Sequence, residues 1–419
     1  MRRFVPFVVL ALAGVPASAV TAHVHAQDLV LWNANVVDVT DGSVRRGASV
    51  VVREGRIVSV EEGRAPAPAG ATALDLEGRY VAPGLIDAHV HVGSAADARR
   101  ALRSGVTTMR SAGASHYADV GMRELHRLGF AETPEYLAAG YHVRPDPAEA
   151  LFQDHPELGR YAPDGIRGAE AIAAMVRLMV ARDVDFVKVN ATERAGTPDT
   201  DPRKQLYSEE ELRVIVEEAA RGGLGVMAHA HGDGGGQAAV RAGVRSIEHG
   251  TYLSEETLAL MAERGTYLVP TIAIVRDLTI PGGDYDNALL NIRGRAMLPR
   301  VQEMARKAHE LGVTIVAATD TGYGPGSTTT LAHELLELVE VGMTPAEALR
   351  AATVNAARLL GVDGHTGRVA PGLQGDLIVL ERNPLEDVGA VQDVLMVVSD
   401  GKVVARKGDW VSDRPVSKP

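Results

Sequence analysis

The sequence predicts an α/β protein, a (β/α)8 TIM barrel inserted into a small β-sandwich that both chain ends build. After Pro83, short apolar or β-branched runs alternate with longer helix-like stretches, which is the pattern of βα repeats around a parallel sheet. Strand-like runs joined by short turns occur at both ends of the chain. The alternating region covers 84–364, which suits a barrel of roughly 250 residues.

The chain begins with a segment typical of a cleaved leader. Arg2 and Arg3 precede an apolar stretch at 4–13, and small residues follow at 17–19 and 24–26, where a signal peptidase would cut. The stretch is too short for a normal transmembrane helix. We therefore predict a signal peptide over 1–26, a periplasmic or secreted location, and no stable membrane insertion after processing. An uncleaved anchor is the alternative.

Composition excludes some classes of function. The sequence has no cysteine, which excludes disulfides and thiolate chemistry. Its formal net charge of -11, without a basic stripe, argues against nucleic acid as a partner. Nucleic acid is therefore not expected as a partner; the metal-ligating residues described below favour a small molecule or a short peptide instead.

Two flanking regions predict the β-sandwich. The N-terminal part, 27–83, has strand-like runs at 29–32, 48–52 and 56–60, with turns at Asp41-Gly42 and Glu54-Gly55. The C-terminal part, 365–419, has similar runs at 376–380, 394–398 and 402–405, with a turn at Asp400-Gly401. A helical stretch at 345–360 is expected to close the barrel and lead back to the sandwich.

Eight strands are expected in the barrel. They are 84–88, 106–110, 135–139, 186–190, 225–229, 246–249, 267–271 and 314–319. Helices are expected between them, among others at 168–182, 208–222, 255–265 and 295–312. Ser208 with Glu211 forms a capping-box pattern, and glycines at 222, 265 and 312 are plausible helix ends.

Residues that can bind metal follow several of these strands. Alternate strand residues face the same side, so His89 and His91 can share one ion, as can His229 and His231. A single His-x-His pair is a weak signal, and for His249 or Asp320 alone a hydrogen-bonded polar residue is the simpler interpretation. Lys188 interrupts an apolar strand; an ammonium that extends to the surface is the alternative there. Their recurrence at strand ends favours one metal centre.

Four segments carry a family resemblance. They are Gly84-Leu85-Ile86-Asp87-Ala88-His89-Val90-His91, Ser246-Ile247-Glu248-His249-Gly250, Ala318-Thr319-Asp320-Thr321 and Gly375-Asp376-Leu377-Ile378-Val379-Leu380. They resemble the signature segments of the amidohydrolase superfamily, in its imidazolonepropionase-like and Xaa-Pro dipeptidase-like branch, which includes hydrolases of ochratoxin-type amides. The resemblance extends from about Asp28 to Lys407.

The resemblance implies a site with two divalent metal ions, zinc being the first candidate. His89, His91 and Asp320 would bind the first ion, and His229 and His249 the second. Lys188 would bridge both as an N-carboxylated lysine, because carbon dioxide turns the amine into an anionic carbamate with two oxygens. Asp320 would also be catalytic, as the proton shuttle.

His231 is expected to be the second catalytic residue. In similar proteins the first histidine of this segment binds metal and the second meets the substrate, so His231 would polarise the scissile carbonyl. A structural histidine is the alternative.

The substrate-binding residues are predicted from the loops after the strands. The segment after the third strand, 140–147, departs from the glycine-rich segment of many relatives and puts their usual substrates in doubt. A guanidinium can bind a carboxylate through two hydrogen bonds, which makes Arg276 the first candidate, Arg144 the second, and Arg194 a further one. The other candidates for lining the pocket are Tyr141, His142, Tyr252 and Tyr323.

Together these features predict a binuclear metal-dependent amidohydrolase that cleaves a dipeptide or an N-acyl amino acid, assembled as a homo-oligomer. One alternative is a mononuclear cyclic amidohydrolase, lactonase or deaminase, for which a bridging Lys188 would be unnecessary. The second is a non-catalytic periplasmic binding protein, which would be expected to have lost metal ligands.

Overall fold

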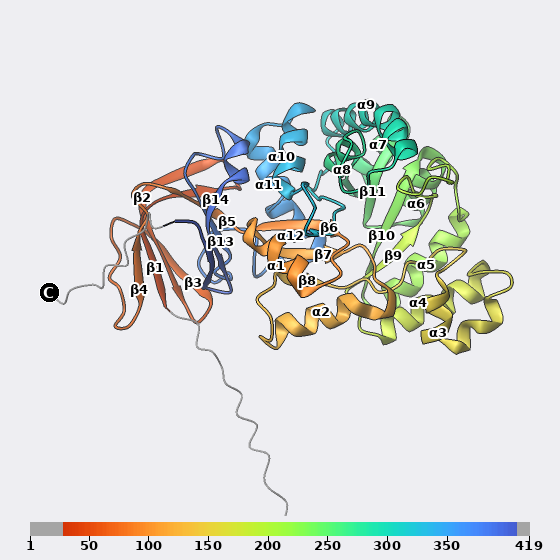
Figure 1. The fold of residues 1–419 in the computed structure, drawn as a ribbon, viewed down its shortest axis with the longest axis horizontal. Helices are drawn as coiled ribbons and strands as arrows, with labels where there is room; N and C mark the ends of the chain where they lie inside the picture. The colour runs from red at the N-terminus through yellow and green to blue at the C-terminus, as the bar shows by residue number, and fades with distance from the viewer. Residues whose placement is uncertain (1–27, 409–419) are drawn as a thin grey trace, which may run out of the picture.

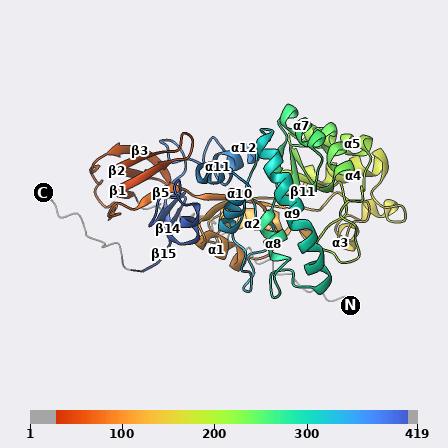
Figure 2. The same ribbon diagram turned by 90° about the horizontal axis from the view of Figure 1, so that it is seen from above.

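The computed structural model describes residues 28–408. The predicted signal peptide at 1–26 lies outside the described residues, as do residues 409–419 of the predicted C-terminal part. Figures 1 and 2 show a sheet at one end of the molecule and a larger α/β body at the other. Within the described range, no helix is long and apolar enough to cross a membrane.

The two chain ends share one eight-stranded sheet of order β15-β14-β13-β5-β1-β2-β3, with β4 beside β1. Strand β13 pairs antiparallel with β5, so that Ile378 lies opposite Ala82 and the C-terminal strands continue the N-terminal sheet. Leu31, Val50 and Val379 are buried in its core. The shared sheet is confirmed, whereas its division into two layers stays a prediction. The strands are β1 (Leu29–Asp38), β2 (Ser43–Arg53), β3 (Arg56–Glu62), β4 (Thr72–Asp75), β5 (Tyr80–Pro83), β13 (Leu377–Leu380), β14 (Val394–Ser399) and β15 (Lys402–Arg406).

The α/β body contains two parallel sheets, of order β6-β7-β8 and β12-β11-β10-β9. Their strands match seven of the eight predicted barrel strands. They are β6 (Leu85–Val90), β7 (Val106–Ser111), β8 (Glu135–Leu137), β9 (Phe186–Asn190), β10 (Gly225–Gly232), β11 (Ser246–Tyr252) and β12 (Tyr267–Val269). Hydrogen bonds also link the edges of the two sheets, from Phe186 N to Ala138 O at 3.2 Å and from Val143 N to Lys188 O at 2.8 Å. The arrangement is consistent with a TIM barrel.

The eighth predicted strand, 314–319, is not a regular strand. It bridges β12 at Ile315, and Asp320 N donates to His89 O at 2.9 Å, so it lies between β12 and β6. The N–H of Ala317 donates instead to Ala351 O, and the N–H of Thr319 to the Asp87 carboxylate. Because these two N–H groups do not donate to a neighbouring strand, the segment is extended but lacks a continuous series of interstrand hydrogen bonds.

Most helices begin and end where the sequence predicts. Helix α5 starts at the predicted capping box of Ser208 and Glu211, and α7 ends at Gly265, which has a φ of 68°. The helix predicted at 295–312 starts earlier, because Asn287 caps its first turn. The single helix predicted at 345–360 is two helices, separated where Thr353 leaves helical geometry with a ψ of -94°.

The α-helices are α1 (Ala95–Arg103), α2 (Ala118–Arg127), α3 (Glu149–Asp154), α4 (Gly168–Ala181), α5 (Glu209–Arg221), α6 (Asp233–Ala242), α7 (Glu255–Arg264), α8 (Ile272–Asp277), α9 (Ala288–Glu310), α10 (Leu331–Glu340), α11 (Pro345–Ala351) and α12 (Val354–Leu360). Short 3-10 helices are η1 (Ser115–Tyr117), η2 (Pro156–Tyr161) and η3 (Val388–Gln392).

Candidate active site

All seven predicted metal-centre and catalytic residues line one cavity of about 570 Å³. They come from the middle or the C-terminal part of β6, β9, β10 and β11, from the residue directly after β6 and from the segment after 319, and so gather toward one end of the parallel strands. The residues are His89, His91, Lys188, His229, His231, His249 and Asp320.

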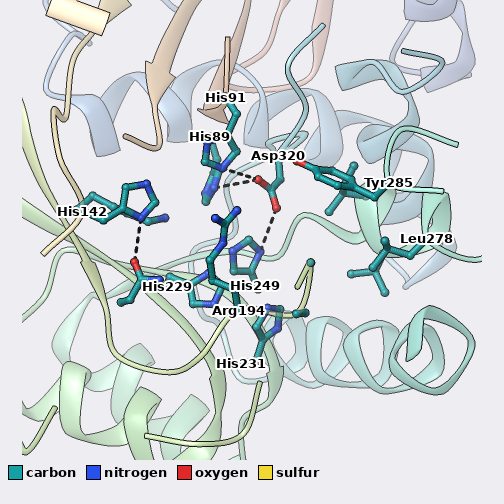
Figure 3. A pocket seen from close by; sticks show the side chains of 16 residues that line it. His89, His91, His142, Arg194, His229, His231, His249, Leu278, Tyr285 and Asp320 are labelled. Atoms are coloured by element: carbon teal, nitrogen blue, oxygen red, sulfur yellow. Dashed lines mark hydrogen bonds and ion pairs between the residues drawn. The ribbon is translucent and has the colours of Figure 1, made fainter. Parts of the chain in front are cut away.

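The first potential metal site consists of His89, His91 and Asp320, whose ligand atoms lie within 4.8 Å of one another. Nε2 of His91 lies 3.0 Å from Oδ1 of Asp320, and Nε2 of His89 lies 3.3 Å from the same oxygen (Figure 3). Burial would raise the pKa of Asp320, but the two histidines hold it well below its usual range. An ionised carboxylate and two imidazoles form a donor set that suits zinc.

The second potential metal site consists of His229, His231 and His249, also with ligand atoms within 4.8 Å. Burial lowers the pKa of His229 and His249 well below the usual value, so both rings are neutral, as metal ligands must be. Nδ1 of His249 contacts the Thr271 hydroxyl at 2.7 Å, and Nδ1 of His231 contacts the Thr251 hydroxyl at 2.8 Å. Neither of these two rings has a hydrogen bond at Nε2 with any described residue.

His231 thus lies as close to the other ring nitrogens as a ligand would. Its ring stacks on that of His249, with centroids 4.7 Å apart and planes 14° apart. Burial lowers its pKa to about 3, so the ring is neutral. A hydroxyl can donate to Nδ1 or accept from it, so Thr251 permits both a ligand at Nε2 and a donor at Nε2. The geometry therefore fits both the predicted substrate contact and metal ligation.

Lys188 stands in the middle of β9 and is only 2% exposed. Its side chain forms no hydrogen bond or ion pair with any described residue, and the charges of Glu248 and Asp320 only partly offset the cost of burying the ammonium. Burial lowers its pKa to about 8, so the neutral amine is accessible near physiological pH. The neutral amine is the form that reacts with carbon dioxide, so the site suits the predicted carbamate.

A buried chain of charges supports His89. Its Nδ1 lies 2.7 Å from Oε2 of Glu248, whose Oε1 accepts a hydrogen bond from Arg110 at 3.1 Å. Burial would raise the pKa of Glu248, but Arg110 and His89 lower it to about 2. The contact orients the ring with Nε2 toward Asp320. Sequence reasoning missed this role, although an acidic residue directly before His249 was a visible signal.

Three site residues have left-handed backbone conformations that residues other than glycine rarely adopt. The φ angles are 73° at His249, 50° at Thr271 and 57° at Asp320. Each conformation costs of order 1–3 kcal/mol, so the surrounding contacts must hold it in place. Such strain concentrates at functional sites.

The predicted substrate-binding residues separate into two groups. His142 lines the cavity, and its Nδ1 lies 3.0 Å from Oδ1 of Asn190. Tyr141 and Arg144 line a second hollow of about 690 Å³ that shares His142 with the first. In contrast, neither hollow includes Tyr252 or Tyr323, and the Tyr323 hydroxyl donates to the Asp87 carboxylate at 2.9 Å.

Arg276 does not reach the cavity. Its neighbours Ile274 and Val275 face the cavity from α8, which turns Arg276 toward α10. There it forms ion pairs with Glu337 and Glu340. The structure therefore corrects the first choice for a carboxylate-binding arginine, because this guanidinium is already neutralised.

Sequence reasoning also missed the apolar wall of the cavity. Tyr285 and Leu278 belong to the segment that follows α8, which carries no motif or periodic pattern. Ile274 and Val275 complete this wall. Figure 3 shows Tyr285 and Leu278 on one side of Asp320 and His142 on the other.

The sequence pattern of the amidohydrolase family matches residues 80–404, most of the chain and all of the residues above. The chain belongs to the amidohydrolase family. The predicted resemblance is thereby confirmed.

Individual relatives of this amidohydrolase include the ochratoxinase of Aspergillus niger, 38% identical over 257 residues, which make up 59% of the chain and 52% of that protein. The chain thus spans about half the length of this curated relative. A Xaa-Pro dipeptidase with methionine in its active site has a TM-score of 0.78 at 26% identity, over 90% of the chain and 99% of that structure. A prolidase complexed with N-methylphosphonate-L-proline has a TM-score of 0.78 at 28% identity, over 91% and 100%.

Proposed function

We propose that this amidohydrolase is a binuclear metal-dependent hydrolase of amide bonds. The observation that carries the proposal is the pair of three-ligand groups in one cavity, together with the buried, unpartnered Lys188. His89, His91 and Asp320 would hold one ion, His229 and His249 the other, and Lys188, once carboxylated, would bridge them. Zinc is the first candidate, because imidazole and carboxylate ligands suit it.

Bound divalent ions would supply Lewis acidity and an acidified water molecule. The chain's own residues then move the proton and steady the substrate. The Asp320 carboxylate, ionised and 19% exposed to the cavity, accepts the proton of the attacking water and delivers it to the departing amine. His231 donates from Nε2 to the scissile carbonyl when the Thr251 hydroxyl donates to its Nδ1.

We propose a dipeptide or an N-acyl amino acid as substrate. The names of the relatives support this class: an ochratoxinase, a Xaa-Pro dipeptidase and a prolidase. The apolar wall of Ile274, Val275, Leu278 and Tyr285 beside the metal-ligand candidates also supports it, since a small amide with an apolar group fits there.

A second candidate is a mononuclear cyclic amidohydrolase. The grouping of His231 with His229 and His249 favours it, because three imidazoles suffice for one catalytic ion with an open position. An imidazolonepropionase of Symbiobacterium thermophilum is 28% identical over 422 residues, 87% of the chain and 93% of that protein.

Metal content and hydrolysis test both candidates. The purified protein, loaded with zinc, is expected to hold about two ions per chain and to hydrolyse members of a panel of dipeptides and N-acyl amino acids, with loss of activity in chelator. About one ion per chain with activity on cyclic amides alone would favour the second candidate. No hydrolysis of any amide would contradict both.

The proposal extends to the architecture. The hydrogen bonds between the sheet edges support a closed (β/α)8 barrel over 84–364, inserted into a β-sandwich of 27–83 and 365–419. Export by the signal peptide at 1–26 and assembly as a homo-oligomer stay predictions.

A further inference from the structure

Two arginines beside the proposed metal centre form no ion pair with any described acidic residue. Arg144 and Arg194 together line the second hollow, and they meet again in a third hollow beside Asn190. Neither guanidinium has a hydrogen bond or ion pair with any other described residue, and the nearby Asp146 forms no ion pair with Arg144. Both side chains are partly buried. The third hollow also contains Asp146 and Glu193, whereas no described acidic residue lines the second hollow, which therefore carries the positive charge of both guanidinium groups.

The two arginines feel each other's charge. Burial and the charge of Arg194 lower the pKa of Arg144, and the charge of Asp146 offsets this only in part. Two partly buried guanidinium groups that line the same hollow repel each other, so their placement costs folding free energy unless an anion binds between them. By contrast, the partly exposed Arg276 is paired with two carboxylates. The arrangement is thus typical of an anion site.

The second hollow adjoins the proposed metal centre. It shares His91, His142 and Arg194 with the first cavity, so a ligand can extend from one to the other. Arg194 is directed toward the histidines and Asp320 in Figure 3. The apolar wall lies on the other side of Asp320. The site is therefore cationic on one side of the ligand candidates and apolar on the other.

The loop that follows Arg194 is held from α9. Arg293 donates to four main-chain oxygens of this loop. The acceptors are Ala195 O at 2.6 Å, Thr197 O at 2.7 Å, Pro198 O at 2.9 Å and Thr200 O at 2.7 Å. A planar guanidinium with five donors can span so many acceptors, whereas an ammonium cannot.

We propose that Arg144 and Arg194 form an anion subsite that binds a carboxylate of the substrate, and that Arg293 is a positioning residue that fixes Arg194 there. This inference rests on the proposed function for its substrate. The substrate carboxylate lies in the second hollow, between Arg144 and Arg194. The scissile carbonyl then lies at the metal-ligand candidates, and an apolar acyl group packs against Leu278 and Tyr285. Amides of an amino acid with an apolar acyl group are the class that fits this order.

The binding test does not depend on hydrolysis. Calorimetry measures the affinity of the zinc-loaded enzyme for 3-phenylpropionate and for the uncharged 3-phenyl-1-propanol. Arg144→Gln and Arg194→Gln are each expected to lower the affinity for 3-phenylpropionate at least tenfold and to leave the affinity for the alcohol unchanged. Arg276→Gln, a matched arginine outside the hollow, is the control and is expected to change neither. Equal affinity for 3-phenylpropionate in wild type, Arg144→Gln and Arg194→Gln overturns the subsite.

The kinetic test uses N-benzoylglycine and N-benzoylglycinamide, with benzoate release as the readout. The wild type is expected to favour the acid in kcat/KM at least tenfold, and Arg144→Gln and Arg194→Gln to abolish that preference through KM. If no amide is hydrolysed while both variants bind 3-phenylpropionate at least tenfold more weakly than wild type, the proposed function fails and the subsite stands. Retention of the acid preference in both variants overturns the subsite as a substrate site.

Arg293→Lys and Arg293→Gln test the positioning role. Both are expected to raise KM for N-benzoylglycine several-fold, to leave N-benzoylglycinamide unchanged, and to speed proteolytic cleavage in 194–200. KM for N-benzoylglycine should be only slightly lower in Arg293→Lys than in Arg293→Gln, because the several donors of the planar guanidinium matter more than its charge. Equal loss for acid and amide would make Arg293 merely structural and overturn its positioning role.

Discussion

Oε2 of Glu248 lies 2.7 Å from Nδ1 of His89, and the contact joins β11 to β6 across the buried interior of the protein. Both side chains are at most 1% exposed. Because Glu248 is also bound by Arg110, its carboxylate cannot rotate away from the imidazole. A residue adjacent in sequence to one ligand candidate, His249, thus orients another on a different strand.

The first prediction follows from this contact. Glu248→Gln keeps the size of the side chain but removes the anionic acceptor of His89, so zinc affinity is expected to fall roughly 10- to 100-fold. Competition with a chromophoric chelator measures it. Glu218→Gln, another arginine-paired carboxylate on α5, is the control. Because Arg110 loses its charged partner, the melting temperature should fall as well; unchanged zinc affinity would contradict the proposed role.

Lys188→Ala tests the bridge. Without the carbamate the enzyme is expected to lose most of its activity and most of one metal equivalent, because no other anion replaces the two bridging oxygens. Short carboxylic acids such as propionate should restore part of both, since they can occupy the vacated volume. Metal analysis and hydrolysis rates are the measurements, and Lys307→Ala on α9 is the control. A fully active variant with two ions would remove Lys188 from the centre.

Asp320→Asn separates metal binding from proton transfer. The amide oxygen can still contact an ion, but the amide cannot accept the proton of the attacking water. Turnover is therefore expected to fall by roughly 100-fold or more, while much of the metal stays bound. Exposed Asp363→Asn is the control. Turnover at the wild-type rate would exclude Asp320 as the proton shuttle.

The metal-ligand candidates were predictable because strand geometry is local. Alternation along β6 and β10 places His89 with His91, and His229 with His231, on one side, and the ends of parallel strands meet at one edge. The structure brings these residues together as expected. The sequence could not show that His231 lies as close to His249 as a ligand, since this depends on the spacing of neighbouring strands.

The failed expectations depend on long-range contacts. The helical phase that turns Arg276 toward Glu337 is set by packing of α8 on α10, which no local pattern of the sequence reveals. Segment 314–319 looks like a strand, but Ala351 and Asp87 accept two of its N–H groups. Tyr285 belongs to a loop without periodicity. In each case a partner distant in sequence decides the outcome.

Glu334 gives a prediction about stability and pH. It is fully buried on α10; Oε2 accepts a hydrogen bond from Ala273 N at 2.7 Å, while Oε1 has no partner among the described residues. Burial raises its pKa from 4.5 to about 8. Between these values the folded protein keeps a proton that the unfolded chain releases, so this group's contribution to stability is full below pH 4.5 and is lost as pH rises toward 8.

Glu334→Gln should remove this pH dependence, because the amide stays neutral at every pH. The variant is expected to melt a few degrees above wild type at pH 8–9, and the difference should shrink steadily toward pH 5. Thermal unfolding across this range measures it. The other buried carboxyls with raised pKa are Asp87, Asp277 and Asp376, and their effect cancels when the wild-type curve is subtracted, because all three titrate in both proteins. Exposed Glu217→Gln is the control and should show no such trend. A constant difference between pH 5 and 9 would mean that Glu334 is ionised in the folded protein, with its charge balanced by the N–H groups at the start of α8.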